Sequence, residues 1–576
     1  MAKRVAIIGA GVSGLTSIKC CLEEGLEPTC FERSDYIGGL WKFTETSGHG
    51  KTQVYKSVVT NVSKEMSSYS DFPFPEDYPN YMNQAKMLEY LQSYTKHFNL
   101  LKYIHLKTTV NSVTKHPDFS ATGQWEVVTE TEGKQDTAIF DAVMICTGLH
   151  LNPHLPLESF PGINAFQGQI LHSQDYRSLE GFQGKRVLVI GLGNTGGDLA
   201  VELSHVASQV FLSTRTGTWV LSRLSEDGYP TFMLSITRFH QMVSCMLPSS
   251  MRNWMMIKRI SKWFNHKNYG LGIAKGQKPQ FIINDELPSR ILCGTVTIKA
   301  SVEQFTETSA IFEDGTVEED IDAVIFTTGF TYSFPFLEEP IRSLYKNRTC
   351  LYKYVFPPNL EKPTMAIMGH INLKGAILPG VELQGRWATR VFKGLCKIPP
   401  TKQLMAEVTK KEQLTKRGVI MDFTKEKPDF ITYLDELATC IGAKPSILSL
   451  FLKDPRLGKE VFFGPCTSYQ YRLTGPGKWD GARNAILTQW DRTLKPLQTR
   501  IVADFSEPSA VPHWLKICGG ISMLFFAVLL AYKSSFQIRL AKIGELGNRL
   551  FTNLANNQQV SIISMQQVLP SASSPV

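Results

Sequence analysis

The chain opens with the stretch Arg4-Val-Ala-Ile-Ile-Gly9-Ala-Gly11-Val-Ser-Gly14. An apolar run of strand length passes into a turn with three glycines, and the residues from Leu15 to Gly25 then have the pattern of a helix. The apolar residues 28–32 predict a second strand, parallel to the first. The opening therefore predicts a strand–helix–strand unit with a glycine turn after its first strand.

A second unit of the same kind begins at Lys185. It reads Lys185-Arg-Val-Leu-Val-Ile-Gly191-Leu-Gly193-Asn-Thr-Gly196, and a predicted helix and a predicted strand follow it. Each unit has a later apolar run that ends in glycine, residues 142–148 for the first and 323–329 for the second. The sequence therefore predicts an α/β fold with two Rossmann-type dinucleotide-binding domains, the second inserted into the first.

The composition excludes several classes of protein. The 576 residues are 43% hydrophobic and 20% charged, which favours a large buried core over disorder. The formal net charge of +9 is spread along the chain without a basic run, so nucleic acid is not an expected partner. Because the eleven cysteines form no C-x-x-C pair, we expect neither a metal site nor a disulfide framework.

The residues that end the second strand of each unit carry opposite charges. Glu32 follows Gly14 by 18 residues, and a carboxylate there accepts hydrogen bonds from ribose hydroxyls and repels a 2′-phosphate. Arg215 follows Gly196 by 19 residues, with the hydroxyls of Ser213 and Thr214 beside it, which suits the 2′-phosphate of NADP. The first site is therefore predicted for FAD or NAD and the second for NADP, as in a flavoprotein that NADPH reduces.

Two segments outside these units have the character of membrane contacts. On a helix, Trp254, Ile257, Ile260 and Phe264 would share one face, opposite a cluster of basic residues. This pattern is typical of a surface helix packed on its own domain or of a helix at a membrane interface. Residues 517–532 carry no charge, although about 20 apolar residues are needed for a span.

The charges around that C-terminal segment favour one topology. Four basic residues follow it, namely Lys533, Arg539, Lys542 and Arg549. The positive-inside rule then disfavours transfer of the tail across the membrane. We expect a monotopic anchor at 513–532, with the tail on the cytosolic side.

Further motifs resemble the mammalian microsomal flavin-containing monooxygenases. They are Gly38-Gly39-Leu40-Trp41, Phe166-Gln-Gly168-Gln-Ile-Leu-His172-Ser-Gln-Asp-Tyr176 and Gly475-Pro-Gly-Lys-Trp-Asp-Gly. The resemblance spans about residues 1–532. It implies an NADPH- and O2-dependent enzyme of the endoplasmic reticulum membrane, with its catalytic domains facing the cytosol. It also implies oxygenation of soft nitrogen and sulfur atoms of small amines and sulfides through a C4a-hydroperoxyflavin, with FAD as the bound cofactor.

The same resemblance assigns the site residues. The FAD contacts are Gly9, Ala10, Gly11, Val12, Ser13, Gly14, Glu32, Leu40, Trp41, Asn61 and Val62. The NADP contacts are Thr60, Asn61, Gly191, Gly193, Thr195, Gly196, Gly197, Asp198 and Arg215. In the family, the amide of Asn61 lies beside the flavin ring, which makes Asn61 the candidate catalytic residue. His172 is a candidate acid or base, but we expect a linker histidine held by packing or backbone contacts.

The expected domain organisation follows from these assignments. It comprises residues 1–155 and 331–445 for the FAD-binding domain, 156–330 for the NADP-binding domain with an insertion at 223–280, 446–512 for a C-terminal extension, 513–532 for the anchor, and 533–576 for an amphipathic and then disordered tail.

The sequence departs from the family pattern at two glycine turns. Thr327-Thr-Gly-Phe330 replaces the usual Ala-Thr-Gly-Tyr, and Asn372-Leu-Lys-Gly375 replaces Gln-Ser-Leu-Gly. These departures leave open a second hypothesis, a weakly active or non-catalytic membrane-anchored protein that binds FAD and NADP. NADPH-dependent oxygen uptake with a tertiary amine or thioether separates the two.

Overall fold

The computed structural model describes residues 2–45, 53–225, 228–273, 280–339, 341–344, 351–416 and 429–500. The chain divides into a compact unit of residues 1–499 and a second unit of residues 500–576. The expected anchor and tail lie outside the described residues. Within the described ranges, no helix has the length and apolar character needed to cross a bilayer.

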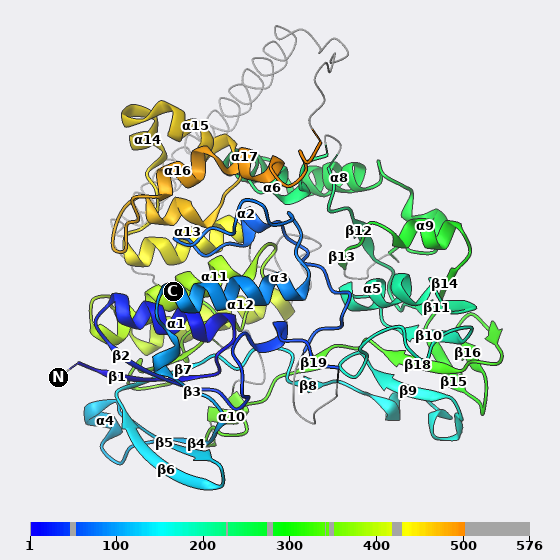
Figure 1. Cartoon of the computed structure of the whole chain (residues 1–576), viewed down its shortest axis with the longest axis horizontal. Coiled ribbons are helices and arrows are strands. Elements are labelled where there is room, and N and C mark those ends of the chain that lie inside the picture. The colour runs from blue at the N-terminus through cyan, green and yellow to red at the C-terminus, as the bar shows by residue number, and fades with distance from the viewer. Residues whose placement is uncertain are drawn as a thin grey trace, which may run out of the picture. The chain divides into compact units, whose positions relative to one another are not determined.

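The first parallel sheet has the strand order β20-β7-β1-β2-β3 (Figure 1). Its strands are β1 (Arg4–Ile8), β2 (Glu27–Phe31), β3 (Ile104–His105), β7 (Ala142–Ile145) and β20 (Met365–Ile367). Four of the five residues of β1 are buried, because helices and loops cover both faces of a parallel sheet. The helix α1 (Val12–Glu23) connects β1 to β2, as the sequence predicts.

The second parallel sheet has the order β14-β11-β10-β18-β9. Its strands are β9 (Gln169–His172), β10 (Arg186–Ile190), β11 (Gln209–Ser213), β14 (Val296–Lys299) and β18 (Ala323–Phe326). The helix α5 (Asn194–Leu203) connects β10 to β11. Both predicted strand–helix–strand units are therefore present, each in its own sheet (Figure 1).

The chain leaves the first sheet after β7 and returns to it at β20, which pairs directly with β7. The whole second sheet lies between these two strands in sequence, so the predicted insertion of one module into the other is confirmed. The outgoing strand β8 (Asn152–Pro153) pairs antiparallel with the returning strand β19 (Phe330–Thr331). These two short strands lie between the sheets in Figure 1 and form the connection between the modules.

Several smaller sheets had no counterpart in the sequence prediction. One antiparallel sheet contains β4 (Thr108–Lys115), β5 (Trp125–Thr131) and β6 (Lys134–Phe140), and another contains β15 (Val302–Phe305), β16 (Ala310–Phe312) and β17 (Val317–Glu318). The short strands β12 (Trp219–Leu221) and β13 (Phe281–Ile283) pair in parallel.

The remaining helices fall into three groups along the chain. Between the strands of the first module lie α2 (Lys64–Ser67), α3 (Gln84–His97) and α4 (Phe119–Thr122). The second module contributes α6 (Thr231–Ser235), α7 (Arg238–Met246), α8 (Ser249–Ile260) and α9 (Leu287–Leu292). After it come α10 (Ile341–Leu344), α11 (Ile377–Lys393), α12 (Thr401–Lys416), α13 (Phe430–Ile441), α14 (Ile447–Lys453), α15 (Pro455–Phe463), α16 (Ala482–Leu487) and α17 (Gln489–Leu494).

The helix expected around Trp254 is present as α8, but its apolar face is only partly covered. Ile260 is buried, whereas the side chain of Trp254 is 59% exposed. Of the two interpretations left open by the sequence, packing on its own domain therefore holds for Ile260 and does not hold for Trp254. Helical spacing groups apolar side chains on one face but does not determine what covers that face.

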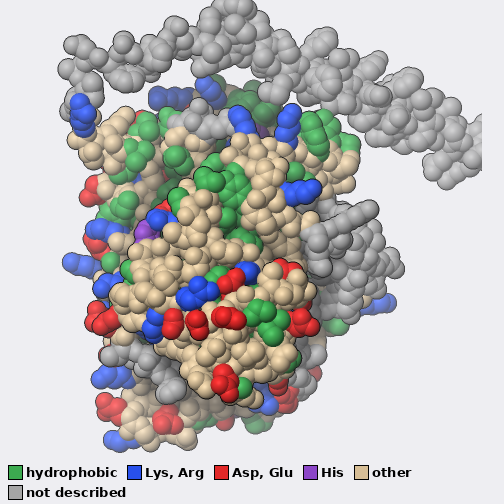
Figure 2. Space-filling model, turned by 90° about the vertical axis from the view of Figure 1, so that its right-hand side faces the viewer, with side chains coloured by type: hydrophobic (Ala, Val, Ile, Leu, Met, Phe, Trp, Pro, Cys, Tyr) green, Lys and Arg blue, Asp and Glu red, His purple; other side chains and the backbone are tan. Residues whose placement is uncertain are grey.

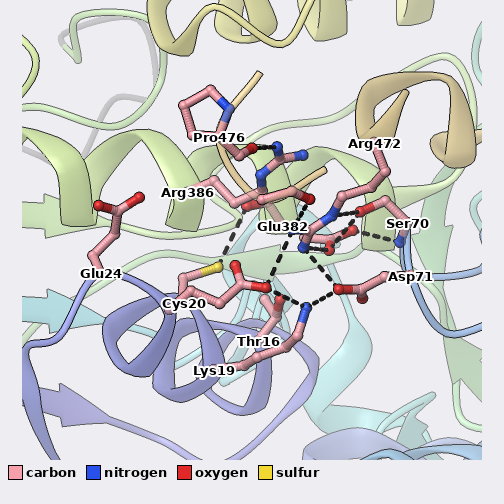
Figure 3. A network of polar contacts seen from close by, with 12 residues as sticks. Thr16, Lys19, Cys20, Glu24, Ser70, Asp71, Glu382, Arg386, Arg472 and Pro476 are labelled. Atoms are coloured by element: carbon pink, nitrogen blue, oxygen red, sulfur yellow. Dashed lines mark hydrogen bonds and ion pairs between the residues drawn. The ribbon is translucent and has the colours of Figure 1, made fainter. Parts of the chain in front are cut away.

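A buried ionic network joins the C-terminal extension to the first module (Figure 3). The side chain of Arg472 is 1% exposed and contacts three carboxylates, those of Glu382 (3.0 Å), Asp71 (3.1 Å) and Glu23 (3.2 Å). Its Nε also donates to Ser70 Oγ at 2.7 Å. Burial alone would raise the pKa of Glu382, but Arg472 and its cationic neighbours hold that pKa below its ordinary value.

Candidate functional site

The first glycine turn has no room for side chains. Gly9 has φ +102°, and a Cβ there would lie 2.8 Å from the carbonyl oxygen of Cys146. A Cβ on Gly14 would lie 1.8 Å from the carbonyl oxygen of Gly9. Gly39 in turn approaches Gly11, with only 3.1 Å between its added Cβ and Gly11 Cα. These glycines hold the end of β1, the start of α1 and the Gly38-Gly39 loop together.

Glu32 lies at the end of β2, beside this turn, as predicted. Its Oε2 accepts a hydrogen bond from the backbone N–H of Ala10 at 2.8 Å. Its Oε1 accepts from the N–H (2.9 Å) and the hydroxyl (2.7 Å) of Ser34. The carboxylate is thus fixed at the mouth of the turn, and its Oε2, with one donor, retains the capacity to accept a ribose hydroxyl.

The first turn fits the diphosphate of FAD. Helix α1 begins at Gly11 without a side-chain cap and without an acidic residue in its first turn, so its N–H groups remain available to an anion. The hydroxyl of Thr147, which follows β7 and adjoins Gly9, is buried without a hydrogen-bond partner in the described structure. A polar ligand in the turn would satisfy these groups.

The other FAD contacts expected from the resemblance surround the same turn. Leu40 and Trp41 lie in a short helical turn that begins at Gly39, and the backbone N–H of Gly38 donates to the carbonyl of Ala10. Ser13 lies in the first turn of α1. Its hydroxyl lies so close to Gly369 that a Cβ on that glycine would be only 2.8 Å away. Val12 adjoins Ser13 at the start of α1.

The second glycine turn repeats this geometry and is more open. Gly191 has φ +104°, and a Cβ on Gly196 would lie 2.0 Å from the carbonyl oxygen of Gly191. A Cβ on Gly193 would meet nothing within 4 Å. The helix α5 also begins without a capping side chain, so a pyrophosphate can approach the N–H groups of its first turn, where Thr195 and Gly197 lie.

Thr327, which replaces the usual alanine of the family pattern, stabilises the second glycine turn. The Thr327 hydroxyl donates to the carbonyl oxygen of Gly191 at 2.7 Å, and its carbonyl oxygen would lie 2.9 Å from a Cβ on Gly191. The usual alanine at this position has no hydroxyl to make that hydrogen bond. This substitution therefore fits an intact nucleotide turn.

Arg215 is exposed after β11, but one of its predicted neighbours is engaged by the protein itself. The guanidinium of Arg215 is exposed and makes no ion pair or hydrogen bond with the part of the chain that the structure describes. Thr214 beside it is partly buried. Ser213 is buried, and its hydroxyl donates to the carbonyl oxygen of Ala300 at 2.7 Å. The prediction that Ser213 offers its hydroxyl proton to a phosphate is therefore wrong.

Asp198 is engaged by protein groups. Its carboxylate accepts hydrogen bonds from the Tyr55 hydroxyl at 2.6 Å and from the Asn284 amide at 3.0 Å. Burial raises the pKa of Asp198 above its ordinary value, although both donors oppose that shift. Because Tyr55 belongs to the first module, this carboxylate joins the two modules, a role that the sequence analysis missed.

Asn61 lies in the loop that Tyr55 begins. Its neighbour Thr60 pairs with Met82 through both its backbone N–H and its hydroxyl oxygen. Val62 is buried in the same hydrophobic cluster as Ala10 and Leu15 of the first glycine turn. Asn61 is therefore held on the first module, and its Oδ1 accepts a hydrogen bond from Arg223 at 2.7 Å.

His172 has the backbone contacts expected of a structural residue. Its Nδ1 accepts from the N–H of Gln174, and its Nε2 lies 3.1 Å from the carbonyl oxygen of Gly329. Since a carbonyl only accepts, Nε2 carries the proton in this tautomer. Burial lowers the pKa of His172, so the ring is neutral at pH 7. The expectation of a linker histidine held by backbone contacts is confirmed.

Comparison with known sequences and structures agrees with this geometry. The model for flavin-binding monooxygenase-like proteins matches residues 2–533. The chain is 67% identical to dimethylaniline monooxygenase (N-oxide-forming) 4 of Homo sapiens over 542 residues, which are 94% of this chain and 97% of that relative. It is 57% identical to form 2 of Cavia porcellus over 506 residues, 87% of this chain and 94% of that relative.

Two solved structures share the fold. S-allyl-L-cysteine S-oxygenase from Allium sativum has a TM-score of 0.59 at 23% identity and covers 86% of this chain and 98% of its own. Cyclohexanone monooxygenase from a Rhodococcus species, with NADP+ bound, has a TM-score of 0.55 at 17% identity and covers 77% and 98%.

These findings confirm the expected family. The match covers both glycine turns and the loop that carries Asn61. The chain therefore belongs to the flavin-binding monooxygenase-like family, and it is an FAD- and NADPH-dependent monooxygenase that acts on small molecules.

Proposed function

We propose that this monooxygenase oxygenates soft nucleophilic nitrogen and sulfur atoms of small amines and sulfides. The observation that carries the proposal is the pair of uncapped glycine turns, with Glu32 beside the first and an unpaired Arg215 beside the second. Bound FAD supplies the redox and oxygen-transfer chemistry. The names of the relatives, which include dimethylaniline monooxygenases, support nitrogen as one acceptor.

The chain's own residues bind and orient in this proposal. The N–H groups of the first turns of α1 and α5 receive the two diphosphates, with Gly9–Gly14 and Gly191–Gly197 shaping the turns. Glu32 accepts from the FAD ribose, and Arg215 pairs with the 2′-phosphate of NADPH. Leu40, Trp41 and Val62 line the flavin region, where Asn61 offers its amide N–H, and Thr60 contacts NADP.

The topology supports the proposed boundaries at the two crossings between the modules. The chain crosses between the modules at β8 and β19, which lie at residues 152–153 and 330–331. These crossings correspond to the proposed boundaries at 155/156 and 330/331. We therefore retain residues 1–155 and 331–445 for FAD, 156–330 for NADP, and 446–512 as an extension.

Isotope incorporation tests the proposed chemistry directly. The FAD-loaded enzyme with NADPH and 18O2 should transfer one labelled atom to a tertiary amine or to a thioether. Unlabelled product would show that the transferred oxygen does not come from O2 and would contradict the proposal. The absence of product from either substrate would support the weakly active or non-catalytic hypothesis instead.

Replacing Asn61 by serine should affect oxygen transfer more than cofactor binding. The shorter side chain loses the amide N–H, while Thr60 and Val62 keep the loop in place. We expect Asn61→Ser to retain FAD and to accept hydride from NADPH at near the wild-type rate without oxygen. In air it should release hydrogen peroxide in place of oxygenated product, measured per NADPH consumed. A protein purified without FAD would show that Asn61 holds the cofactor, and unchanged product yield would remove it from the mechanism.

Membrane lipid is the proposed second contact of the enzyme. Helices α7 and α8 expose large hydrophobic side chains, namely Met242, Met246, Met251, Trp254 and Met255. Lys258 and Arg259 are exposed in the last turn of α8, and Lys258 lies over the Trp254 ring. In Figure 2, hydrophobic side chains lie mostly in the upper part of the face with basic ones among them, basic side chains also lie lower down, and most acidic ones lie in the middle and below. Such a surface suits the interface of an anionic bilayer.

The topology of the proposed anchor gives a separate prediction. We place residues 513–532 in the endoplasmic reticulum membrane as a monotopic anchor, with the catalytic domains and the tail in the cytosol. A glycosylation site engineered near Ser573 should therefore stay unmodified in microsomes. Glycosylation at that site would place the tail in the lumen and replace the monotopic arrangement with a single span.

A further inference from the structure

One arginine of the second module, Arg223, donates hydrogen bonds to the loop of the first module that carries Asn61. Arg223 follows β12, and its side chain is 14% exposed. Its Nη2 donates to Asn61 Oδ1 at 2.7 Å, and its Nε donates to the carbonyl oxygen of Thr60 at 3.2 Å. The guanidinium therefore binds the Asn61 side chain and the preceding backbone together.

Arg223 is itself held from two other directions. Its Nη1 lies 3.1 Å from Asp285 Oδ2, and its backbone N–H donates to Asp285 Oδ1 at 2.8 Å. The Tyr81 hydroxyl donates to the Arg223 carbonyl oxygen at 2.7 Å. With side chain and backbone both fixed, the guanidinium has little freedom to leave Asn61.

The polarity of this contact determines which way the carboxamide faces. A guanidinium only donates, so it donates to the oxygen of Asn61 and would repel the Nδ2 hydrogens of a flipped amide. In the described structure, Asn61 Nδ2 donates to no protein group. The Nδ2 hydrogens are therefore directed away from Arg223 and remain able to donate to a bound group.

We propose that Arg223 is a positioning residue, which fixes the carboxamide of Asn61 so that its N–H faces the bound cofactors. This inference rests on the proposed role of Asn61. It also makes that donor depend on contact between the modules, because Arg223 comes from the second and Asn61 from the first.

The test compares Arg223→Met, Arg223→Lys and Asn61→Asp with Asn61→Ser in the full-length, FAD-loaded enzyme. Asn61→Asp keeps an acceptor for Arg223 but lacks the N–H donor. Arg290→Met is the matched control, since Arg290 is a partly exposed arginine of the same module that pairs with Glu286. The measurements are FAD content, anaerobic reduction by NADPH, the dissociation constant of NADP+, peroxide per NADPH, and the thermal unfolding midpoint.

We expect Arg223→Met to retain FAD and near-normal anaerobic reduction, while the ratio of peroxide to product rises roughly 10-fold or more, as for a lost charge-assisted hydrogen bond. Arg223→Lys should release less peroxide per NADPH than Arg223→Met, because lysine keeps a charged donor. Asn61→Asp should leak peroxide with an unfolding midpoint near that of the wild type. Adding Arg223→Met to Asn61→Ser should raise peroxide no further, and the two substitutions should also be non-additive in the unfolding midpoint.

Three results would overturn the inference. The inference would be contradicted if Arg223→Met released no more peroxide per NADPH than the wild type while Asn61→Ser released more. That result would leave the proposed role of Asn61 intact. A rise in the NADP+ dissociation constant without peroxide leakage would make Arg223 a cofactor ligand instead. Normal coupling in Asn61→Ser would remove both the proposed role of Asn61 and the inference built on it.

Discussion

Arg215→Ala should raise the Michaelis constant for NADPH by roughly 10–100-fold and leave that for NADH almost unchanged, the effect of one lost charge-assisted contact with a phosphate. The guanidinium is exposed and has no ion-pair partner in the described structure, so its removal breaks no internal contact. The measurement is steady-state oxidation of each cofactor by the FAD-loaded enzyme.

Arg290→Ala provides a control for this experiment, because Arg290 belongs to the same module and pairs with Glu286. We expect that variant to keep both Michaelis constants. If Arg215→Ala raised the Michaelis constants for NADPH and NADH equally, Arg215 would support the fold of the second module and would not recognise the 2′-phosphate.

Arg472→Met should lower the free energy of unfolding by about 3–5 kcal/mol, the range for removing one partner of a buried ion pair. The substitution would leave Glu382 and Asp71 close together in a buried site (Figure 3). The partly exposed Glu23 also loses its partner, and Lys19 remains as the cation in contact with Asp71 and Glu23. Denaturant unfolding of the FAD-loaded protein, followed by tryptophan and flavin fluorescence, measures the loss.

The same C-terminal extension offers a matched exposed pair. Arg483 lies 2.6 Å from Asp454, but its side chain is 55% exposed, so Arg483→Met should cost about 0–1 kcal/mol. Similar losses for the two variants would contradict the view that the buried network, and not surface charge, fastens the extension to the first module.

Local sequence patterns predicted the parts of the fold that depend on local physics. An apolar run, closely spaced glycines and a helix fix each nucleotide turn within a dozen residues, so both units were predictable. The helix bounds were less so, since α1 and α5 both begin a few residues earlier than expected. The insertion followed from the repeated pattern, since β7 and β18 each complete the sheet of their own module.

The remaining features depend on contacts between distant segments. Arg223 meets Asn61 across 162 positions, and Arg472 meets Glu23 across 449, with no local pattern to indicate either pair. Ser213 could not be assigned from its place at a strand end, because its hydroxyl bonds to Ala300 beyond the neighbouring strand. The sequence also could not show what contacts the apolar face of α8, since the spacing of apolar residues is the same for a helix on a protein core and for a helix on a bilayer.

The central claim is that one chain binds FAD at the Glu32 turn and NADPH at the Arg215 turn in order to oxygenate a small soft nucleophile. The most direct measurement is the yield of N-oxide or S-oxide per reduced cofactor, with a tertiary amine or a thioether and the purified FAD-containing protein. We predict that product accumulates at the expense of NADPH, and far more slowly with NADH at the same concentration. A protein that binds both cofactors but yields only hydrogen peroxide, or oxidises neither substrate, would contradict the claim.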